Sequence, residues 1–293
     1  MRNYIKIIFC ALAIIFLCGC TPRAQNEATT NNTTNNTTSN QSTSVEESKS
    51  SVVTTTDAVA DPVANFNDYS NDKVVWGPGN IENHQQPADP LSLNQTFSEL
   101  GGKWLIDDDK SVCLTFDEGY ENGFTPSILD TLKEKKVKAI FFVTYDFASS
   151  NPELIKRMID EGHSVGNHTW HHYTMDEVDE ETAREEIAYL HNYLKDNFNY
   201  TMSYFRFPKG EFSQKSLAIV QEQGYESIFW SFAYADWDVD NQPSEDEAFQ
   251  KICESTHKGE IILLHAVSEV NANVLPRVID DIRQQGYSFT TEI

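Results

Sequence analysis

The sequence contains too few cysteines for a disulfide-stapled fold. Only five are present in 293 residues, and three of them lie within the first twenty positions. Cys113 and Cys253 are the two that remain, and Cys113 sits inside an apolar segment typical of a buried strand. We therefore expect two free thiols and a domain stabilised by its hydrophobic core.

Positive charge is also scarce. Lysine and arginine total 22 against 45 aspartates and glutamates, which gives a formal net charge of −23. Binding to a phosphate backbone needs clustered lysine and arginine, so this balance argues against nucleic acid as a partner. An acidic surface otherwise favours solubility and does not identify a substrate.

Long hydrophobic runs are missing after the first eighteen residues. Residues 7–18 form an apolar run that follows two basic residues, and it is too short to span a bilayer but typical of a secretory signal. The run ends in Leu17-Cys-Gly-Cys20, which resembles the lipobox of bacterial lipoproteins, where the cysteine matching Cys20 is lipidated. We predict a lipoprotein signal peptide over 1–20 and a protein held on the outer face of the bacterial cytoplasmic membrane. An ordinary signal peptide or an uncleaved anchor is the alternative.

Aromatic residues are nearly absent from 21–67, which is rich in asparagine, threonine and serine. Such a segment cannot bury enough apolar surface to fold, so we predict a disordered tether. Aromatic residues return near its end, and the turn signals of residues 68–107 indicate an N-terminal extension packed on the main domain. The main domain is predicted to span 108–293.

Segments of strand and helix character alternate from Ser111 onward. Strands are predicted at 112–116, 139–143, 163–166, 204–207, 227–231, 261–264 and 288–291. Helices are predicted at 127–136, 153–161, 176–198, 214–223, 245–256 and 274–285. This α/β alternation indicates a parallel sheet or barrel, and the segment is short for eight complete units. We expect a distorted, shortened (β/α) barrel, with an open doubly wound sheet as the alternative.

Polar residues follow five of these strands at the same structural position. They are Asp117-Glu118, the segment Asn167–His172, Arg206, Asp236 and His265. In α/β folds the carboxyl ends of parallel strands meet on one face, and active sites form there. We therefore expect these residues to share one site.

His168 and His172 are candidate metal ligands because they are four residues apart. Two imidazoles and one carboxylate form a catalytic zinc set that keeps one position open for water. Glu118 or Asp117 would complete this set. The alternative is that these are ordinary loop histidines, and His171 competes with His172 for the role.

Asp117 and His265 are candidates for an acid–base pair. A metal-activated water needs a base, and Asp117 would stay ionised if Arg206 held it. His265 would serve as the general acid if Asp236 fixed its ring. The alternative for His265 is a core histidine at the end of a strand.

Five ordered motifs carry a resemblance to a known family. They are Thr115-Phe-Asp-Glu-Gly119, His168-Thr-Trp-His-His172, Arg206-Phe-Pro-Lys-Gly210, Asp236-Trp237 and Ile262-Leu-Leu-His265. From about Lys110 to the C-terminus the chain resembles the polysaccharide deacetylases, which carry the NodB-homology domain and form carbohydrate esterase family 4. The resemblance implies a distorted barrel and metal-dependent hydrolysis of an N-acetyl group from an amino sugar.

The resemblance also implies a role for each matching residue. Asp117 resembles the catalytic base, Arg206 its tether, Asp236 the residue that orients the acid, and His265 the acid. His168 and His172 resemble the metal ligands. Leu263 and Trp237 are expected to line the acetyl pocket, and Tyr120, Phe207 and Pro208 are also expected to bind substrate.

Glu118 departs from the family pattern, in which a second aspartate binds the metal. Its carboxylate reaches one methylene further, and we predict it as the third ligand. Within the family the chain resembles the muramic-acid deacetylases that prepare muramic δ-lactam in the spore cortex. The resemblance lies in this change, in the runs at 117–123 and 83–87, and in the stretch 230–237.

The prediction is therefore an extracytoplasmic enzyme that deacetylates N-acetylmuramic acid residues of peptidoglycan. Its partners would be glycan strands and the membrane, through lipidated Cys20, and it is expected to be a monomer. The metal is expected to be Zn²⁺, with Co²⁺, Mn²⁺ and Mg²⁺ as alternatives. A peptidoglycan N-acetylglucosamine deacetylase and a non-catalytic wall-glycan-binding lipoprotein are the alternative functions.

Overall fold

The computed structural model describes residues 66–81 and 83–293. They belong to one compact unit, Ala60–Ile293. The predicted signal peptide, including Cys20, and nearly all of the predicted tether lie outside the described residues. Within the described part of the chain, no helix has the length and apolar character needed to cross a membrane.

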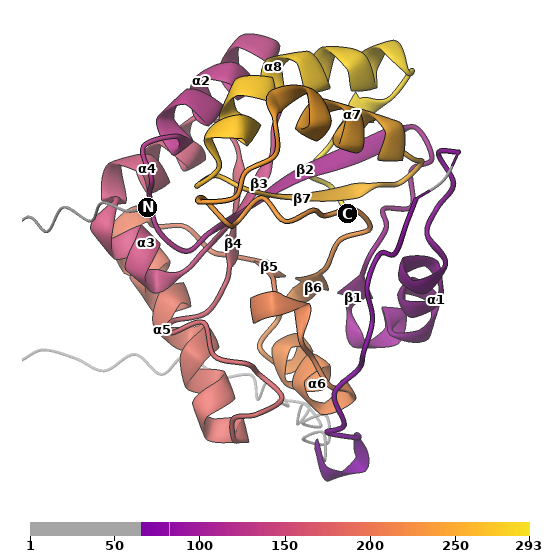
Figure 1. The fold of residues 1–293 in the computed structure, drawn as a ribbon. Coiled ribbons are helices and arrows are strands. Elements are labelled where there is room, and N and C mark those ends of the chain that lie inside the picture. The colour runs from indigo at the N-terminus through magenta and orange to yellow at the C-terminus, as the bar shows by residue number, and fades with distance from the viewer. Residues whose placement is uncertain (1–65, 82) are drawn as a thin grey trace, which may run out of the picture. The chain divides into compact units, whose positions relative to one another are not determined.

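The centre of the unit is a curled parallel sheet (Figure 1). Its strands are β1 (Gly102–Lys103), β2 (Ser111–Glu118), β3 (Ile140–Val143), β4 (Ser164–Asn167), β5 (Tyr204–Phe205), β6 (Glu226–Ile228), β7 (Ile261–His265) and β8 (Ser288–Phe289). They follow the order β1-β6-β5-β4-β3-β2-β7, and β8 pairs with β2. Strands that are consecutive in sequence are therefore neighbours in space from β2 to β6, as in a barrel.

The chain that follows β6 closes this sheet against β7. The Ser231 N–H donates to the Ile261 carbonyl at 3.0 Å, and the Leu263 N–H donates to the Phe232 carbonyl at 2.9 Å. Phe232 forms a parallel bridge with Ile262. The predicted distorted barrel is thus confirmed, and the open doubly wound alternative is wrong.

Helices cover the outside of the curled sheet (Figure 1). They are α1 (Ala88–Thr96), α2 (Thr125–Lys135), α3 (Tyr145–Ser150), α4 (Pro152–Asp160), α5 (Glu180–Phe198), α6 (Gln214–Glu222), α7 (Glu245–Ser255) and α8 (Glu269–Gln284). The predicted helices fall on α2 and α4 to α8. Helix α8 begins five residues before the predicted start at 274, because Ser268 caps its first turn by accepting from the Asn271 N–H. Helix α3 was not predicted.

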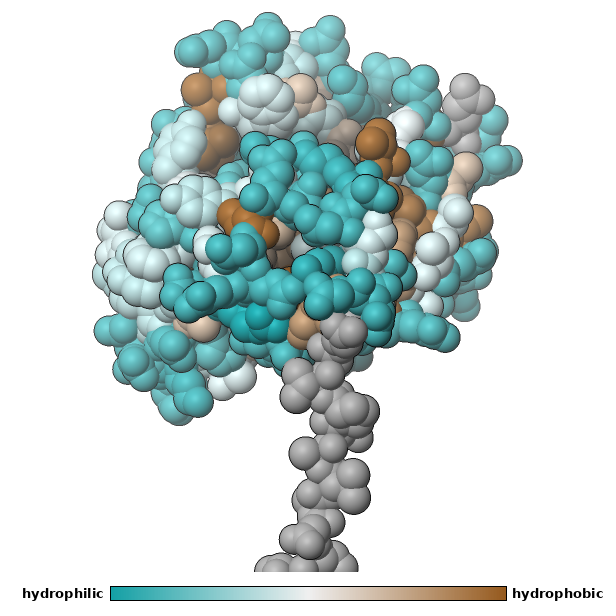
Figure 2. Space-filling model, turned by 90° about the horizontal axis from the view of Figure 1, so that it is seen from below, coloured by the Kyte–Doolittle hydropathy of each residue, from teal (hydrophilic) through white to brown (hydrophobic). Residues whose placement is uncertain are grey.

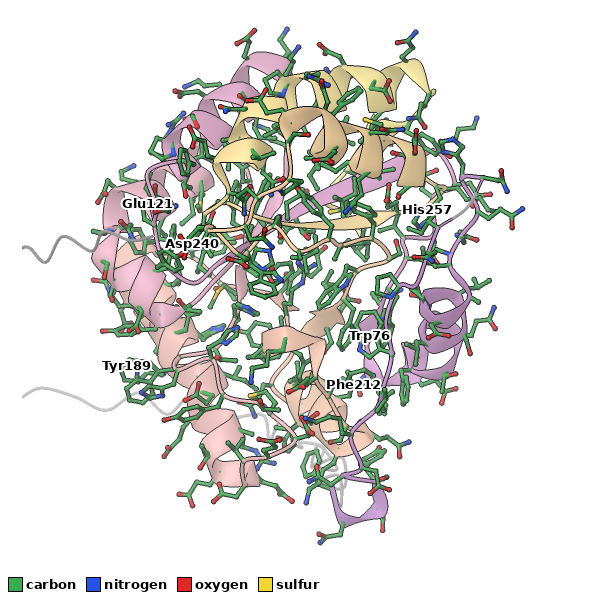
Figure 3. All side chains as sticks on the ribbon, in the orientation of Figure 1. Trp76, Glu121, Tyr189, Phe212, Asp240 and His257 are labelled. Carbon is green, nitrogen blue, oxygen red and sulfur yellow. The ribbon has the colours of Figure 1, made fainter. Side chains whose placement is uncertain are left out.

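The described part of the predicted N-terminal extension supplies β1, which pairs with β6. Trp76 anchors this segment, since its ring packs edge-on against Trp104 and Phe229 and its Nε1 donates to the Gly210 carbonyl at 2.9 Å. Figure 3 shows Trp76 close to Phe212, on the side of the barrel that carries β1 and α1. The extension thereby fixes a turn near the carboxyl end of β5.

Two buried clusters occupy the two faces of the sheet. The smaller one includes Cys113, Phe142 and Ile228 inside the barrel, and the larger one fills the layer between sheet and helices. Cys113 and Cys253 are both buried free thiols, as expected.

The outer face seen in Figure 2 is mainly hydrophilic and carries small, separate hydrophobic patches, which suits an acidic soluble domain.

Strand β2 is buried along its whole length, and its side chains alternate between these two faces. Thr115 and Asp117 point into the barrel, where both accept hydrogen bonds from Arg206. Phe116 belongs to the layer beneath the helices. Because β2 continues through residue 118, Glu118 points to the same layer as Phe116, away from Asp117.

Glu118 is therefore a carboxyl buried beneath helix α2. Its Oε2 accepts from the Thr125 hydroxyl at 3.5 Å, and its Oε1 has no partner. Burial, followed by the charges of Glu121 and Asp117, raises the pKa of Glu118 well above 4.5. The folded protein thus favours the protonated form at this position.

We predict that Glu118→Gln makes stability less sensitive to pH. The raised pKa stabilises the fold fully below the unfolded-state pKa of about 4.5, and this stabilisation is lost as pH rises towards the folded-state value. The neutral amide of the variant has no such loss. The free energy of unfolding of the variant should therefore rise relative to that of wild type as pH increases. Urea unfolding at a series of pH values measures this. Glu134→Gln, at an exposed position of α2, is the control, and a wild-type pH slope in Glu118→Gln would contradict the prediction.

Candidate active site

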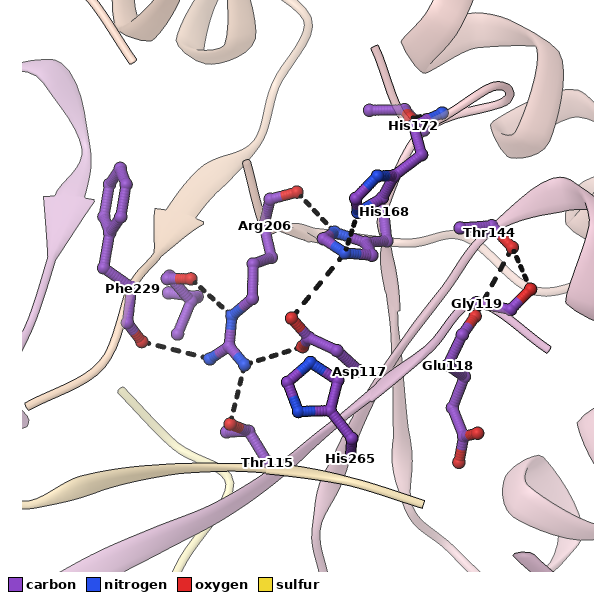
Figure 4. A network of polar contacts seen from close by, with 12 residues as sticks. Thr115, Asp117, Glu118, Gly119, Thr144, His168, His172, Arg206, Phe229 and His265 are labelled. Carbon is purple, nitrogen blue, oxygen red and sulfur yellow. Dashed lines mark hydrogen bonds and ion pairs between the residues drawn. The ribbon is translucent and has the colours of Figure 1, made fainter. Parts of the chain in front are cut away.

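Four strand ends bring the central polar residues together. Asp117 is the penultimate residue of β2, His168 follows β4, Arg206 follows β5 and His265 ends β7. Asp117 and His265 are direct partners in the pairing of β2 with β7. Figure 4 shows the four side chains around one point inside the barrel mouth.

The ion pair between Arg206 and Asp117 is the centre of this group. Arg206 is fully buried, and its Nη1 lies 2.8 Å from Asp117 Oδ1 and donates to Thr115 Oγ1 at 2.8 Å. Its Nε and Nη2 donate to the carbonyls of Ile228 and Phe229 at 2.9 and 3.0 Å. These bonds use four of the five guanidinium N–H groups, so the buried charge is compensated by both an acid and carbonyl dipoles.

Arg206 determines the ionisation of Asp117. Burial alone would raise the pKa of this carboxyl, but the charge of Arg206, helped by His168 and His265, outweighs it and the pKa is lowered. Asp117 is therefore an anion with one oxygen held by Arg206. The other oxygen, Oδ2, lies 3.6 Å from His168 Nε2.

His168 and His172 present ring nitrogens to a common point. His168 Nδ1 lies 2.9 Å from the Arg206 carbonyl, which can only accept, so Nδ1 carries the proton and Nε2 keeps a lone pair. His172 Nε2 lies 3.1 Å from His168 Nε2. Burial lowers the pKa of both rings, to about 4 for His172, and both stay neutral near pH 7. Two converging neutral imidazoles suit a divalent metal ion.

The histidine that joins His168 is His172, because Thr169 and His172 adopt left-handed backbone with φ of 72° and 60°. His171 points elsewhere, and its Nδ1 lies 2.6 Å from Oε1 of buried Glu186. The sequence left open whether His171 or His172 lies beside His168, and this local turn places His172 there.

The predicted third ligand is not at this point. Glu118 faces helix α2, on the opposite side of β2 from Asp117, so the set His168, His172 and Glu118 is not assembled. Across the described residues, no group of three or more histidine, cysteine, aspartate or glutamate side chains has the arrangement needed to hold a metal ion. The residues therefore fit a metal as a two-histidine pair, and the expectation for Glu118 is corrected.

His265 forms a second charged pair, with Asp236. Its Nδ1 lies 2.7 Å from Asp236 Oδ1, and its backbone N–H donates to Oδ2 of the same carboxylate at 2.8 Å. Burial alone would lower the pKa of His265, but Asp236 outweighs it and the pKa is raised. Asn271 on α8 also donates to Asp236 and to the His265 carbonyl. Sequence reasoning missed Asn271 because it placed the start of that helix after it.

These groups border a cavity of about 660 Å³. Of the predicted substrate-binding residues, Leu263, Tyr120 and Trp237 line it, and the last two are 53% and 60% exposed. Lys209, Trp230 and Tyr234 also line it and were not predicted from the sequence. The remaining lining residues are Asp117, Gly119, His168, His172, Ala233, His265 and Val267.

Phe207 and Pro208 do not line the cavity, and the prediction for them is corrected. Phe207 is fully buried and stacks on Phe229 with ring centroids 5.5 Å apart. Pro208 is buried at the start of the following turn. Both residues thus position the segment after β5 from behind the cavity wall.

Comparison with known proteins agrees with the motifs. Residues 106–228 match the family model described as polysaccharide deacetylase. The chain is 40% identical over 227 residues to the peptidoglycan-N-acetylmuramic acid deacetylase PdaA of Bacillus subtilis, covering 75% of this chain and 84% of that protein. It is 32% identical over 184 residues to a peptidoglycan-N-acetylglucosamine deacetylase of Bacillus cereus, covering 61% and 66%.

The fold agrees as well. The solved structure of Bacillus subtilis PdaA, a family 4 carbohydrate esterase, matches with a TM-score of 0.72 and 37% identity, over 75% of this chain and 95% of that one. Family motifs, sequence identity and fold thus coincide over the barrel and its cavity. The chain belongs to the polysaccharide deacetylase family, the amide-hydrolysing enzymes of carbohydrate esterase family 4.

Proposed function

We propose that this protein hydrolyses the N-acetyl group of N-acetylmuramic acid residues in peptidoglycan. One observation carries the proposal: a carboxylate and an imidazole at one cavity have their pKa values moved in opposite directions by charged partners. Arg206 lowers the pKa of Asp117 and favours its ionised form, and Asp236 raises the pKa of His265 and favours its protonated form. Two groups whose pKa values are moved in opposite directions form the arrangement that a general base and a general acid require.

In the proposed reaction Asp117 accepts a proton from the attacking water. The water oxygen forms a bond to the acetamide carbonyl carbon, and the bond from that carbon to the sugar nitrogen then breaks. His265 donates its Nε2 proton to the departing nitrogen, so the products are acetate and the free amine. Leu263 and Trp237 border the cavity where the acetyl methyl would be held.

Polysaccharide deacetylases are typically metal-dependent, and His168 and His172 are the residues that would hold the ion here. A bound divalent ion would polarise the acetamide carbonyl and lower the pKa of water. The two imidazole ligands favour Zn²⁺ or Co²⁺ over Mg²⁺, which prefers oxygen ligands, and Mn²⁺ is intermediate. With two protein ligands in place of three, we expect weaker retention than in a complete zinc site.

The choice of muramic acid rests on the relatives. Identity is 40% to a protein named as an N-acetylmuramic acid deacetylase, against 32% to one named as an N-acetylglucosamine deacetylase. The free amine formed next to a lactyl carboxyl is the precursor of a muramic δ-lactam, so a role in spore-cortex formation is included in the proposal. The glucosamine enzyme is the second candidate.

A substrate in the cell wall also implies work outside the cytoplasm. The lipobox-like run ending at Cys20 supports a lipid anchor on the outer face of the cytoplasmic membrane. The residues of both charged pairs come from one chain, so a monomer suffices for the reaction. A purely wall-binding lipoprotein would not need these acid–base pairs.

Mass analysis of treated peptidoglycan tests the proposed function. Purified enzyme supplied with Zn²⁺ is incubated with glycan strands, with and without stem peptides, and the digested sugars are analysed for acetyl loss. We expect loss from muramic acid. Loss confined to glucosamine would favour the second candidate, and no loss from either sugar would favour the wall-binding alternative.

We predict that Asp236→Asn moves the basic limb of the pH–activity profile to lower pH. His265 must be protonated to act as the acid, and its raised pKa keeps it so above the ordinary histidine value of about 6.5. Loss of the Asp236 charge lowers that pKa, and activity then falls earlier as pH rises. The profile of kcat/KM measures this, with Asp240→Asn, at an exposed position of the same loop, as control. An unmoved basic limb would remove His265 from the role of acid.

A further inference from the structure

One positive side chain borders the catalytic cavity. Among the described residues that line it, Lys209 is the only lysine or arginine. Arg206 lies behind Asp117, fully buried, and its N–H groups are used by Asp117, Thr115 and two carbonyls. Lys209 is therefore the cation that a ligand in the cavity can reach.

The ammonium of Lys209 has no anionic partner among the described ion pairs. Its Nζ donates to the Thr174 hydroxyl at 3.3 Å, and that hydroxyl donates in turn to Glu211. Glu211 is paired with Lys73 instead, at 3.2 Å. Because an ammonium has three N–H donors and Thr174 uses one, two donors remain for a ligand.

The backbone holds Lys209 in a strained position. Its φ is 59°, in the left-handed region that is unfavourable for a residue with a Cβ. The next residue, Gly210, lies against Trp230 so closely that a Cβ there would be 2.5 Å from the ring, and its carbonyl accepts from Trp76. Such strain persists where packing fixes it, often at functional sites. The turn thus places Lys209 beside Trp230 at the cavity.

N-Acetylmuramic acid differs from N-acetylglucosamine by a lactyl ether that ends in a carboxyl group. That group is an anion when no peptide is attached and a neutral amide when a stem peptide is present. A lysine with free donors at the cavity would bind the anion and gain nothing from glucosamine, which lacks the group.

We propose that Lys209 binds the free lactyl carboxylate of the muramic acid residue and is the residue that makes the enzyme select it. This inference rests on the proposed function. It assigns the specificity to Lys209, which belongs to the same motif as Arg206 and neither abstracts nor donates a proton in the reaction.

The test compares two muramic acid glycans that differ in the lactyl group alone. One carries the free carboxylate, and in the other the carboxyl is converted to its methyl amide. Acetate release is measured for wild type, Lys209→Met and Lys209→Arg, with kcat and KM determined separately. Lys195→Met, an exposed lysine on α5 away from the cavity, is the matched control for loss of one positive charge.

We expect wild type to prefer the carboxylate substrate. Lys209→Met should raise KM for that substrate roughly tenfold or more, the value of a charge-assisted hydrogen bond, and should abolish the preference over the amide. Lys209→Arg keeps the charge and should keep most of the preference, which excludes misfolding as the cause. Lys195→Met should behave as wild type.

A preference that survives in Lys209→Met would overturn the inference. The proposed function would then still stand, because wild type would still release acetate from muramic acid. If wild type released acetate from N-acetylglucosamine oligomers and from neither muramic acid glycan, the proposed function would fail and the inference with it.

Discussion

The buried contact between Arg206 and Asp117 is the interaction on which the site depends. A carboxylate at the end of a buried strand is costly to ionise, and the guanidinium removes that cost by pairing with it at 2.8 Å. Arg206 also joins β2 to the end of β6 and the residue after it by donating to the carbonyls of Ile228 and Phe229, and its own carbonyl orients the His168 ring. One side chain and its backbone thus fix the proposed base Asp117, the imidazole of His168 and part of the barrel wall.

A second contact of the same kind, between His265 and Asp236, gives the site its asymmetry. Both carboxylates are buried, but one stabilises a fixed positive charge and the other raises the proton affinity of an imidazole. The proposed base and the proposed acid are therefore each tuned by a charged partner, which lowers the pKa of Asp117 and raises the pKa of His265. His168 and Lys209 line the same cavity, where we propose that the first would hold a metal ion and the second an anionic substituent.

Much of this was predictable from the sequence, because strand positions and the polar residues after them depend on local pattern. The side on which Glu118 lies was not, since β2 runs two residues beyond its predicted end at 116 and alternation then turns Glu118 towards helix α2. The roles of His171 and His172 depend on left-handed backbone, which sequence spacing does not report. Asn271 was missed because the helix was predicted to begin at 274, whereas the cap at Ser268 starts it at Glu269.

The role of Asp117 as the general base is tested by acetate release from a muramic acid glycan in the variant Asp117→Asn. The amide keeps the shape of the side chain and removes its basicity. We expect a fall in kcat of about 10²–10⁴-fold, the usual contribution of a general base, in protein that circular dichroism shows to be folded. Activity of folded Asp117→Asn within a few-fold of wild type would contradict it, because the proton of the attacking water would then have another acceptor.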